Sequence, residues 1–490
     1  MKFSAQLLLT TLSKSTTHIS IFVLSIILSR YFTKDDYGTY LHIQLITNLS
    51  VWAFLLGIPH GIYYFLPKSE NQRAYVMTVM GLISSIAIIV SGIIAWTSDG
   101  LSNFLSNPRI SDLTPVLFCM ILFQIPLTVF EPLMISTKRV KEFAATQLLF
   151  NALFFCAVAI PVLFDCSMVE ILWWLAAVYA FNSAVVFYFT LTIAFSFKGR
   201  QTQGEAFSLA QQIRYTLPIG LSMNVMELSR YVDKVVVSNQ SNAEDYAVYT
   251  RGAMEIPVIG IIANTLDNLM MPKFIEAYKN KNIDEILDIW HGAIRLMAAF
   301  IYPSCLFLIF TAPLLIPAIF SDKYASSVII FQIYTLGLLS RISTFDIIMR
   351  AIGRTKAILW ITLFSVIVNL ILTYWFMSLW GLMGAPIATV ITMLAMRIGY
   401  LKAITGYFDI SLNAVFPWAS LGKSLLASVV SAIPVFYMLS WNINVWILLL
   451  SMGVVFSAIY LVLIRVLDSL TERDKSSVRD VLPSRLKWVV

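Results

Sequence analysis

The feature that most constrains this chain is a series of long apolar runs, separated by short polar segments, along all 490 residues. A helix needs about 20 mostly apolar residues to cross the hydrocarbon core of a bilayer, and about fourteen runs of that length can be distinguished. Charged residues make up only 12% of the chain, against about 25% in soluble proteins. The sequence therefore predicts an all-α, polytopic membrane protein and excludes a water-soluble enzyme.

The apolar runs give the predicted positions of the helices. They cover residues 7–29, 41–66, 75–96, 114–136, 143–164, 169–196, 213–237, 246–271, 290–312, 326–350, 358–378, 381–403, 420–439 and 444–465. Between the eighth and ninth runs, the amphipathic stretch 273–290 is either an interfacial helix or a solvated connector.

The placement of lysine and arginine predicts the topology. Only Arg30, Lys34, Arg109 and Lys323 fall in outer loops when the N-terminus is placed in the cytoplasm. Six more lie deeper within spans, and the remainder gather at cytoplasmic segments and helix ends. This asymmetry follows the positive-inside rule and predicts that both termini are cytoplasmic. The net charge of +7 is then a sign of topology and not of nucleic-acid binding.

Similar segments recur in the same order in the two halves of the chain. The segment 36–40, Asp-Tyr-Gly-Thr-Tyr, is followed 209 positions later by 245–249, Asp-Tyr-Ala-Val-Tyr. Similar pairs are 66–68 with 271–273 and 138–141 with 353–356. An offset of six helices keeps both copies in one orientation, which indicates a parallel repeat. We therefore expect an N-lobe (1–197), a cytoplasmic linker (198–212), a C-lobe (213–406), two added helices (407–466) and a cytoplasmic tail (467–490).

Three segments resemble those of a known family. Residues 29–40, Ser-Arg-Tyr-Phe-Thr-Lys-Asp-Asp-Tyr-Gly-Thr-Tyr, resemble the segment after the first helix of polysaccharide flippases of the multidrug/oligosaccharidyl-lipid/polysaccharide exporter superfamily. Residues 312–324 resemble that family's turn after the ninth helix, and 380–389 the start of its twelfth. The resemblance implies a flippase that moves an undecaprenyl-diphosphate-linked oligosaccharide across the bacterial cytoplasmic membrane for surface polysaccharide synthesis.

Charged residues inside the spans are the candidate site. A charge at the bilayer centre costs at least about 2.5–3.5 kcal/mol, so it normally faces a partner or a wet cavity. One interpretation is a hydrated cavity between the predicted lobes, in which cations hold a diphosphate or acidic sugars. The alternative is structural ion pairing, for example of Arg230 with Glu227 or of Arg251 with Glu255. The candidate substrate-binding residues are Lys14, His18, Arg230, Lys234, Arg251 and Arg341.

Helical geometry places some of these residues together. At about 100° per residue, Glu227, Arg230 and Lys234 share one stripe of the predicted seventh helix. Among the acids, Glu131 and Asp267 are candidates for coupling transport to an ion, with solvation at the membrane interface as the alternative.

Searches for enzymatic motifs are negative. The chain has no phosphate-binding Gly-x-x-x-x-Gly-Lys-Ser/Thr loop, and its four cysteines are scattered, so we expect neither a cofactor nor a metal site. Asp35 and Asp36, in an outer loop, suit either a glycosyltransferase or the N-terminal end of the second helix, where acids complement the helix dipole.

The predicted protein is thus a transporter and not an enzyme. Its expected partners are the lipid-linked substrate, membrane lipid and a polysaccharide polymerase, and not nucleic acid. The alternatives are a membrane glycosyltransferase or polymerase, a peptidoglycan-precursor flippase, and a drug exporter of the same superfamily.

Overall fold

The computed structural model describes residues 3–197, 208–254, 256–343, 345–472 and 474–475, and it leaves the side chains of residues 1–14 undescribed. The described part is almost entirely helical and contains no strand. The predicted all-α class is therefore confirmed. The chain divides into two compact units, Met1–Ala247 and Val248–Val490.

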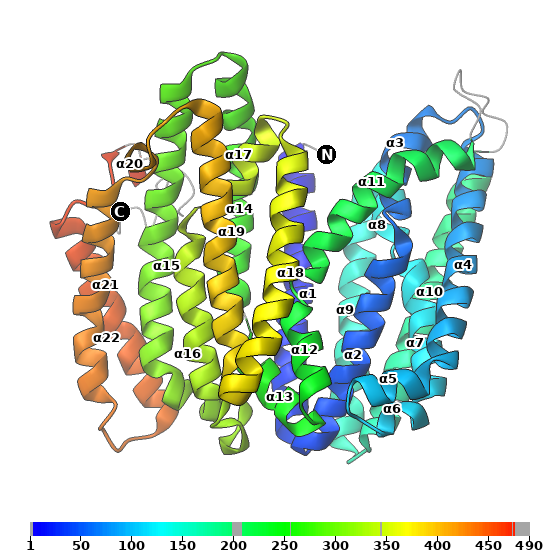
Figure 1. Ribbon diagram of the computed structural model, residues 1–490. Helices are drawn as coiled ribbons and strands as arrows, with labels where there is room; N and C mark the ends of the chain where they lie inside the picture. Colours follow the sequence, from blue (N-terminus) through cyan, green and yellow to red (C-terminus); the bar gives the residue numbers. More distant parts are fainter. Residues whose placement is uncertain (1–2, 198–207, 255, 344, 473, 476–490) are drawn as a thin grey trace. The chain divides into compact units, whose positions relative to one another are not determined.

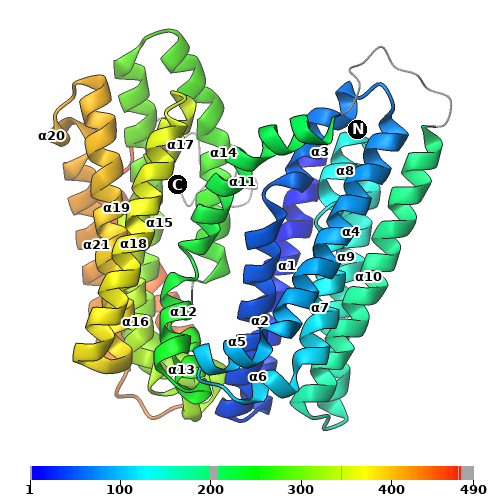
Figure 2. The ribbon, with the colours of Figure 1, turned by 45° about the vertical axis from the view of Figure 1, so that its right-hand side comes forward.

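In its described residues, the first unit contains twelve helices and the beginning of a thirteenth, whose arrangement can be followed in Figure 2. They are α1 (Phe3–Tyr31), α2 (Lys34–Leu55), α3 (Ile58–Lys68), α4 (Gln72–Trp96), α5 (Ser98–Phe104), α6 (Arg109–Asp112), α7 (Thr114–Leu127), α8 (Phe130–Ser136), α9 (Val140–Leu163), α10 (Met168–Ser196), α11 (Leu209–Leu228), α12 (Val232–Gln240) and α13 (Ala243–Gly252). Helix α7 packs against α2, α4 and α10, while α1 packs along α9.

The second unit takes up the end of α13 and the remaining helices (Figure 1). They are α14 (Pro257–Lys279), α15 (Ile283–Phe320), α16 (Ser327–Leu338), α17 (Phe345–Ala351), α18 (Thr355–Trp380), α19 (Gly384–Phe408), α20 (Leu412–Val415), α21 (Trp418–Met438) and α22 (Val445–Val466), with 3-10 turns η1 (Asp322–Tyr324), η2 (Leu339–Ile342) and η3 (Gly381–Met383). Helix α15 packs against α14, α16, α21 and α22.

The apolar length of these helices fits a bilayer. Within the described residues, nine helical stretches are long and apolar enough to cross a membrane, or ten if α2 and α3 form one span bent by 41°. One of the nine, Thr355–Phe408, contains two helices, α18 and α19. Each predicted apolar run coincides with a helix or a broken helix, and the number of fourteen spans stays a prediction.

The outward faces of several helices are apolar, which suits contact with lipid. On α22, Leu450 and Val454 are exposed while Met452 and Phe456 are buried against α21 and α15. Lipid tails are as apolar as leucine, so burial of such faces inside the protein is not required.

The bend between α2 and α3 depends on close backbone contact. Leu56 and Gly57 both have positive φ angles, 45° and 73°. A Cβ atom placed on Gly220 of α11 would lie 2.1 Å from the carbonyl carbon of Leu56. Glycine at 220 therefore lets α11 pack directly on the bend.

The stretch 273–290 differs from both sequence interpretations. Helix α14 continues to Lys279, a turn follows with Lys281 at a φ of 54°, and α15 begins at Ile283. Helix α15 has 38 residues, or about 57 Å at 1.5 Å per residue, so it extends well beyond the hydrocarbon core. The polar residues belong to the ends of two long helices. The interpretation of 273–290 as a separate interfacial helix is therefore wrong.

Two predicted segments fall mainly outside the described residues. Residues 198–207 of the predicted linker and 476–490 of the predicted tail are among those that the structure does not describe. The lobe boundaries and the parallel repeat stay predictions.

Candidate functional site

The segment after the first helix begins α2, as one sequence interpretation expected. The Thr33 hydroxyl accepts a hydrogen bond from the Asp36 amide at 3.1 Å and caps the helix. The Arg109 guanidinium lies 2.7 Å from the Asp35 carboxylate and 2.8 Å from that of Asp36. Burial lowers the pKa of Arg109, but hydrogen bonds to Asp36 and Asp35 outweigh it and hold the pKa above its usual value. Both acids therefore serve in helix capping and ion pairing.

Gly38, from the same segment, lies very close to the backbone of another helix in the first unit. A Cβ atom at this position would lie 1.9 Å from the carbonyl oxygen of Ala243 and 2.5 Å from its carbonyl carbon. Ala243 is the first residue of α13. Only glycine fits where α2 meets the start of α13.

A buried polar cluster joins the two copies of the Asp-Tyr segment. The Asn107 amide donates to the Thr39 hydroxyl at 3.0 Å and lies 3.0 Å from the His42 Nδ1 atom. The His42 ring stacks on Tyr246 with centroids 4.4 Å apart. The repeated segments therefore meet each other within the first unit, where they hold α2, α13 and the loop before α6 together.

The predicted stripe on the seventh helix is wrong because that helix is broken. Helix α11 ends at Leu228 and α12 begins at Val232, so Arg230 lies in the intervening turn. Its side chain is 72% exposed and lies 3.8 Å from the Glu227 carboxylate. The Lys234 ammonium lies 5.4 Å from the centre of the Tyr231 ring. The two cations stay on adjacent segments, but no continuous helical face joins them.

The first-helix candidates lie in α1. The Lys14 side chain is outside the described part, while His18 is exposed. The adjacent Thr17 hydroxyl lies within hydrogen-bonding distance of the Asn151 side chain of α9, at 3.0–3.1 Å. Thr17 therefore makes a polar contact between α1 and α9, beside the exposed His18 side chain.

Arg251 is the most buried of the predicted cations whose side chains the structure describes. Its side chain is 7% exposed and its guanidinium lies 5.2 Å from the centre of the Phe320 ring, a cation–π contact. Glu255, the expected partner in the structural alternative, lies outside the described residues.

The second unit brings two predicted residues into one charged cluster. Arg397 of α19 interacts electrostatically with Arg341 of η2, Asp346 of α17 and Asp267 of α14. Asp346 also forms an ion pair with Arg350 one turn further along α17. The tenth predicted helix breaks between η2 and α17, so Arg341 and Asp346 lie on separate helical segments.

This break in the tenth helix is held by a buried hydrogen bond. Ser343, at the end of η2, has an extended backbone with φ −137° and ψ 137°. Its hydroxyl accepts a hydrogen bond from the Trp290 indole nitrogen at 2.7 Å. Non-helical backbone at membrane depth is tolerated where it is buried in protein or lines a cavity.

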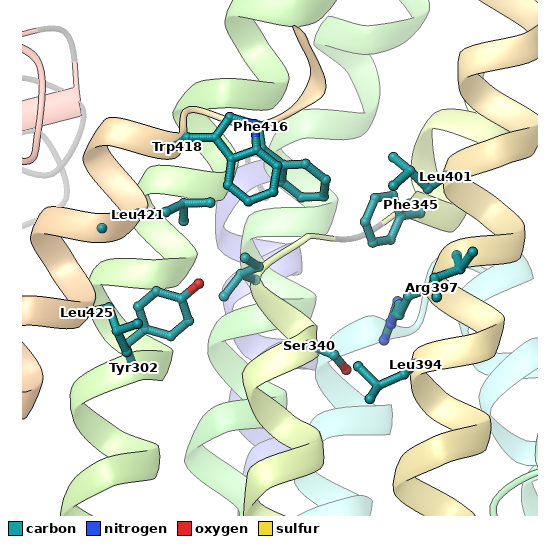
Figure 3. A pocket seen from close by; sticks show the side chains of 13 residues that line it. Tyr302, Ser340, Phe345, Leu394, Arg397, Leu401, Phe416, Trp418, Leu421 and Leu425 are labelled. Carbon is teal, nitrogen blue, oxygen red and sulfur yellow. The ribbon is translucent and has the colours of Figure 1, made fainter. Parts of the chain in front are cut away.

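A cavity of about 440 Å³ lies beside the break (Figure 3). Its walls come from α15, η2, α17, α19, α21 and the segment before α21, and they are mostly apolar. The polar side chains of Tyr302, Ser340 and Arg397 also line it. The Nε atom of Arg397 is buried and has no hydrogen-bond partner among the described residues.

Two further charged residues have structural contacts. Glu131, in the first turn of α8, is partly buried and interacts electrostatically with Tyr63 of α3. Arg295 of α15 binds both carboxylate oxygens of Asp474 in the tail, at 2.6 and 3.2 Å. Because the two side chains are 14% and 5% exposed, this pair ties the described part of the tail to α15.

A second tail contact lies at the surface, beyond the end of α22. The Lys475 ammonium lies 3.0 Å from the Asp468 carboxylate and 2.8 Å from that of Glu472. The hydrogen bond from Lys475 holds the pKa of Asp468 below its usual value.

Sequence reasoning missed Arg397. The predicted twelfth helix ended at residue 403, so Arg397 was assigned to the cytoplasmic helix end, whereas α19 continues to Phe408. Reading the apolar periodicity through Tyr407 and Phe408 would have placed Arg397 deeper in the helix.

Comparisons with known proteins agree with this fold. A profile of the family described as "Polysaccharide biosynthesis protein" matches residues 27–329. A solved structure of the lipid II flippase MurJ in an inward closed conformation is similar, with a TM-score of 0.73, 15% identity, and coverage of 93% of this chain and 98% of that one. A multidrug resistance MATE transporter in an inward-facing conformation has a TM-score of 0.62 and 15% identity, covering 80% of this chain and 95% of that one.

A further match is a transporter of the same superfamily from Pyrococcus furiosus, with a TM-score of 0.50 and 15% identity, covering 82% of this chain and 95% of that one. The search of curated proteins found no match.

These observations define an all-helical protein with several helices long and apolar enough to cross a membrane, in the fold of the lipid II flippase and MATE transporter structures. The chain belongs to the polysaccharide biosynthesis protein family, whose profile covers more than half of its length. The resemblance found in the sequence is therefore confirmed at the level of the family.

Proposed function

We propose that this protein flips an undecaprenyl-diphosphate-linked oligosaccharide from the cytoplasmic to the outer leaflet of the bacterial inner membrane, for the synthesis of O-antigen, capsule or exopolysaccharide. The observation that carries the proposal is the family match over residues 27–329 in a chain whose spans hold arginine and lysine side chains. Transport proceeds by alternating access, opening first inwards and then outwards, with both termini in the cytoplasm.

The anionic head group supplies the physical reason for the intramembrane cations. A diphosphate needs positive charge and hydrogen-bond donors when it leaves water, and arginine provides both in a planar, forked geometry. The proposed head-group contacts are Lys14, His18, Arg230, Lys234, Arg251 and Arg341. Glu131 and Asp267 are the proposed carriers of a coupling ion. Arg230, 72% exposed, and the half-buried Lys234 are accessible to such a ligand.

A complementation assay tests the residue assignment. Arg230→Ala, Lys234→Ala and Arg341→Ala are each expressed in a strain lacking the chromosomal gene, and surface polysaccharide is measured after membrane insertion is confirmed. The matched control is Lys402→Ala, which removes an exposed lysine of α19. We expect reduced export in the three variants and normal export in the control. Unchanged export in all three would refute the assignment.

A peptidoglycan-precursor flippase is the second candidate, because the lipid II flippase covers 93% of this chain with a TM-score of 0.73. Loss of such a protein stops growth. Viability of the deletion strain, with accumulation of a lipid-linked glycan, would favour the polysaccharide substrate over the peptidoglycan precursor.

The other candidates make different predictions. A drug exporter, suggested by the likeness to MATE transporters, would make a deletion strain sensitive to drugs. A glycosyltransferase or polymerase would lose activity when Asp35 and Asp36 are changed to Asn, whereas in our proposal these acids only brace the start of α2. A polymerase is instead a proposed partner, and neighbouring genes for a polymerase and glycosyltransferases would support the pathway.

A further inference from the structure

The cavity of the second unit has a composition that the proposed head-group contacts do not explain. Its walls are almost entirely apolar and include the aromatic rings of Phe345, Phe416 and Trp418. Yet Arg397, which carries a permanent charge, lines the same space. A guanidinium in mostly apolar surroundings is costly unless all its donors are satisfied, so a cavity of this kind favours an anionic ligand.

The charged neighbours of Arg397 are of both signs. The first of its charged neighbours is another arginine, Arg341, which repels it. Asp346 is shared with Arg350 through an ion pair, and Asp267 is also part of the cluster. The Arg397 Nε atom is a buried donor without a hydrogen-bond partner among the described residues.

Polar groups line two sides of the cavity. Figure 3 shows the Arg397 guanidinium directed from α19 towards Ser340, and the Tyr302 hydroxyl directed into the space from the opposite wall. The Ser340 hydroxyl donates to the Gly337 carbonyl at 2.7 Å, so its oxygen can still accept. A cationic fork and a phenol hydroxyl suit the oxygens of a phosphate.

The surroundings of the cavity indicate that the ligand enters from the bilayer. Apolar side chains that line it are also exposed on membrane helices: Leu394 and Ile398 on α19, and Trp418 and Leu425 on α21. A water-soluble anion gains nothing from such a surface, whereas an acyl or prenyl chain does. The broken tenth helix, fixed by the Trp290–Ser343 hydrogen bond, keeps one wall in place.

From these observations we propose that the second unit binds an anionic lipid in this cavity, with the lipid phosphate at Arg397 and its chain along α21. This site is additional to the proposed head-group contacts and does not depend on the identity of the transported glycan. The shared chemistry is a phosphate ester on a long apolar chain, found in membrane phospholipids and in polyprenyl phosphates.

Native mass spectrometry of the full-length protein in nanodiscs tests the proposal. Phosphatidylcholine nanodiscs with and without phosphatidylglycerol are compared for wild type, Arg397→Gln and the control Lys402→Gln, which changes an exposed lysine of the same helix outside the cavity. We expect wild type and control to retain phosphatidylglycerol selectively, and Arg397→Gln to lose about tenfold or more of that selectivity, as expected for hydrogen bonds to a charged group.

Equal retention of phosphatidylglycerol by wild type and Arg397→Gln would overturn the proposal, as would equal retention of both lipids by wild type. A second variant, Leu425→Trp, fills the cavity without altering charge and must also reduce retention of phosphatidylglycerol. If Arg397→Gln fails to fold, the result for Leu425→Trp decides alone.

Competition with polyprenyl phosphate distinguishes the two sources of the lipid. Displacement of phosphatidylglycerol assigns the site to the carrier lipid, and persistence of phosphatidylglycerol assigns it to membrane phospholipid.

Discussion

Replacement of Gly38 by alanine tests whether the glycine of the Asp-Tyr-Gly segment is needed for close backbone packing. The new Cβ atom would lie 1.9 Å from the Ala243 carbonyl oxygen, and real Cβ atoms essentially never approach closer than 3.0 Å. The start of α13 would therefore have to move by about 1.1 Å. Both sides of the contact are backbone, so no flexible side chain can absorb the displacement.

The expected cost follows from this geometry. Overpacking a well-filled interior costs about 1–3 kcal/mol, and a contact between two backbones belongs at the upper end of that range. A loss of about 3 kcal/mol lowers the ratio of folded to unfolded protein by about 100-fold. The measurement is the free energy of unfolding of the purified protein, from a reversible titration with SDS.

Two further variants make the measurement specific. Gly92→Ala on α4 is the matched control, because a Cβ atom there meets nothing within 4 Å, and its stability should be unchanged or higher. Adding Ala243→Gly to Gly38→Ala should not restore stability, since the clash is with backbone atoms. Rescue by Ala243→Gly, or a Gly38→Ala variant as stable as the control, would refute the reasoning.

Three other perturbations have defined outcomes. Asp474→Ala leaves the mostly buried Arg295 guanidinium uncompensated and should lower the free energy of unfolding by about 3 kcal/mol, whereas a loss below about 0.5 kcal/mol would contradict a buried pair. Ser343→Ala leaves the buried indole N–H of α15 without its acceptor and should cost about 1–3 kcal/mol in the same titration. The pKa of Asp468 is lowered in the folded state, so its contribution is present above its ordinary value of 3.8 and disappears as the pH falls below it. The difference in melting temperature between wild type and Asp468→Asn should vanish over that interval, and a difference that grows on acidification would be inconsistent with this sign.

Hydropathy and charge were sufficient to predict where the helices lie. Apolar runs of about 20 residues are a physical requirement of the bilayer, so each predicted run coincides with a helix or a broken helix. Asp35 and Asp36 at the start of α2 also followed from a local rule, since acids favour the first turn of a helix.

The helix breaks were not predictable in the same way. The turns at Arg230 and Ser343 contain neither proline nor glycine, the residues that usually mark an interruption. The Ser343 break depends on the distant Trp290 side chain, which no local pattern reveals. The helical-wheel argument therefore failed for Arg230 with Lys234.

The candidate site was predictable only in part. Intramembrane charge identified Arg251 and Arg341 as unusual, and the structure places them in a cation–π contact and in a charged cluster. Arg397 was missed because its role depends on how far α19 extends and on which helices surround it. Which helices surround a given charged residue is a tertiary property that a single sequence does not encode locally.

The central claim, that this transporter flips a lipid-linked oligosaccharide, is tested most directly in proteoliposomes. A lipid-linked oligosaccharide with a fluorescent label on the glycan is placed in both leaflets, and a membrane-impermeant quencher is added outside. We predict that the purified protein makes the inner-leaflet pool accessible, whereas protein-free vesicles keep it protected. Continued protection of that pool in vesicles that contain correctly inserted protein would contradict the claim.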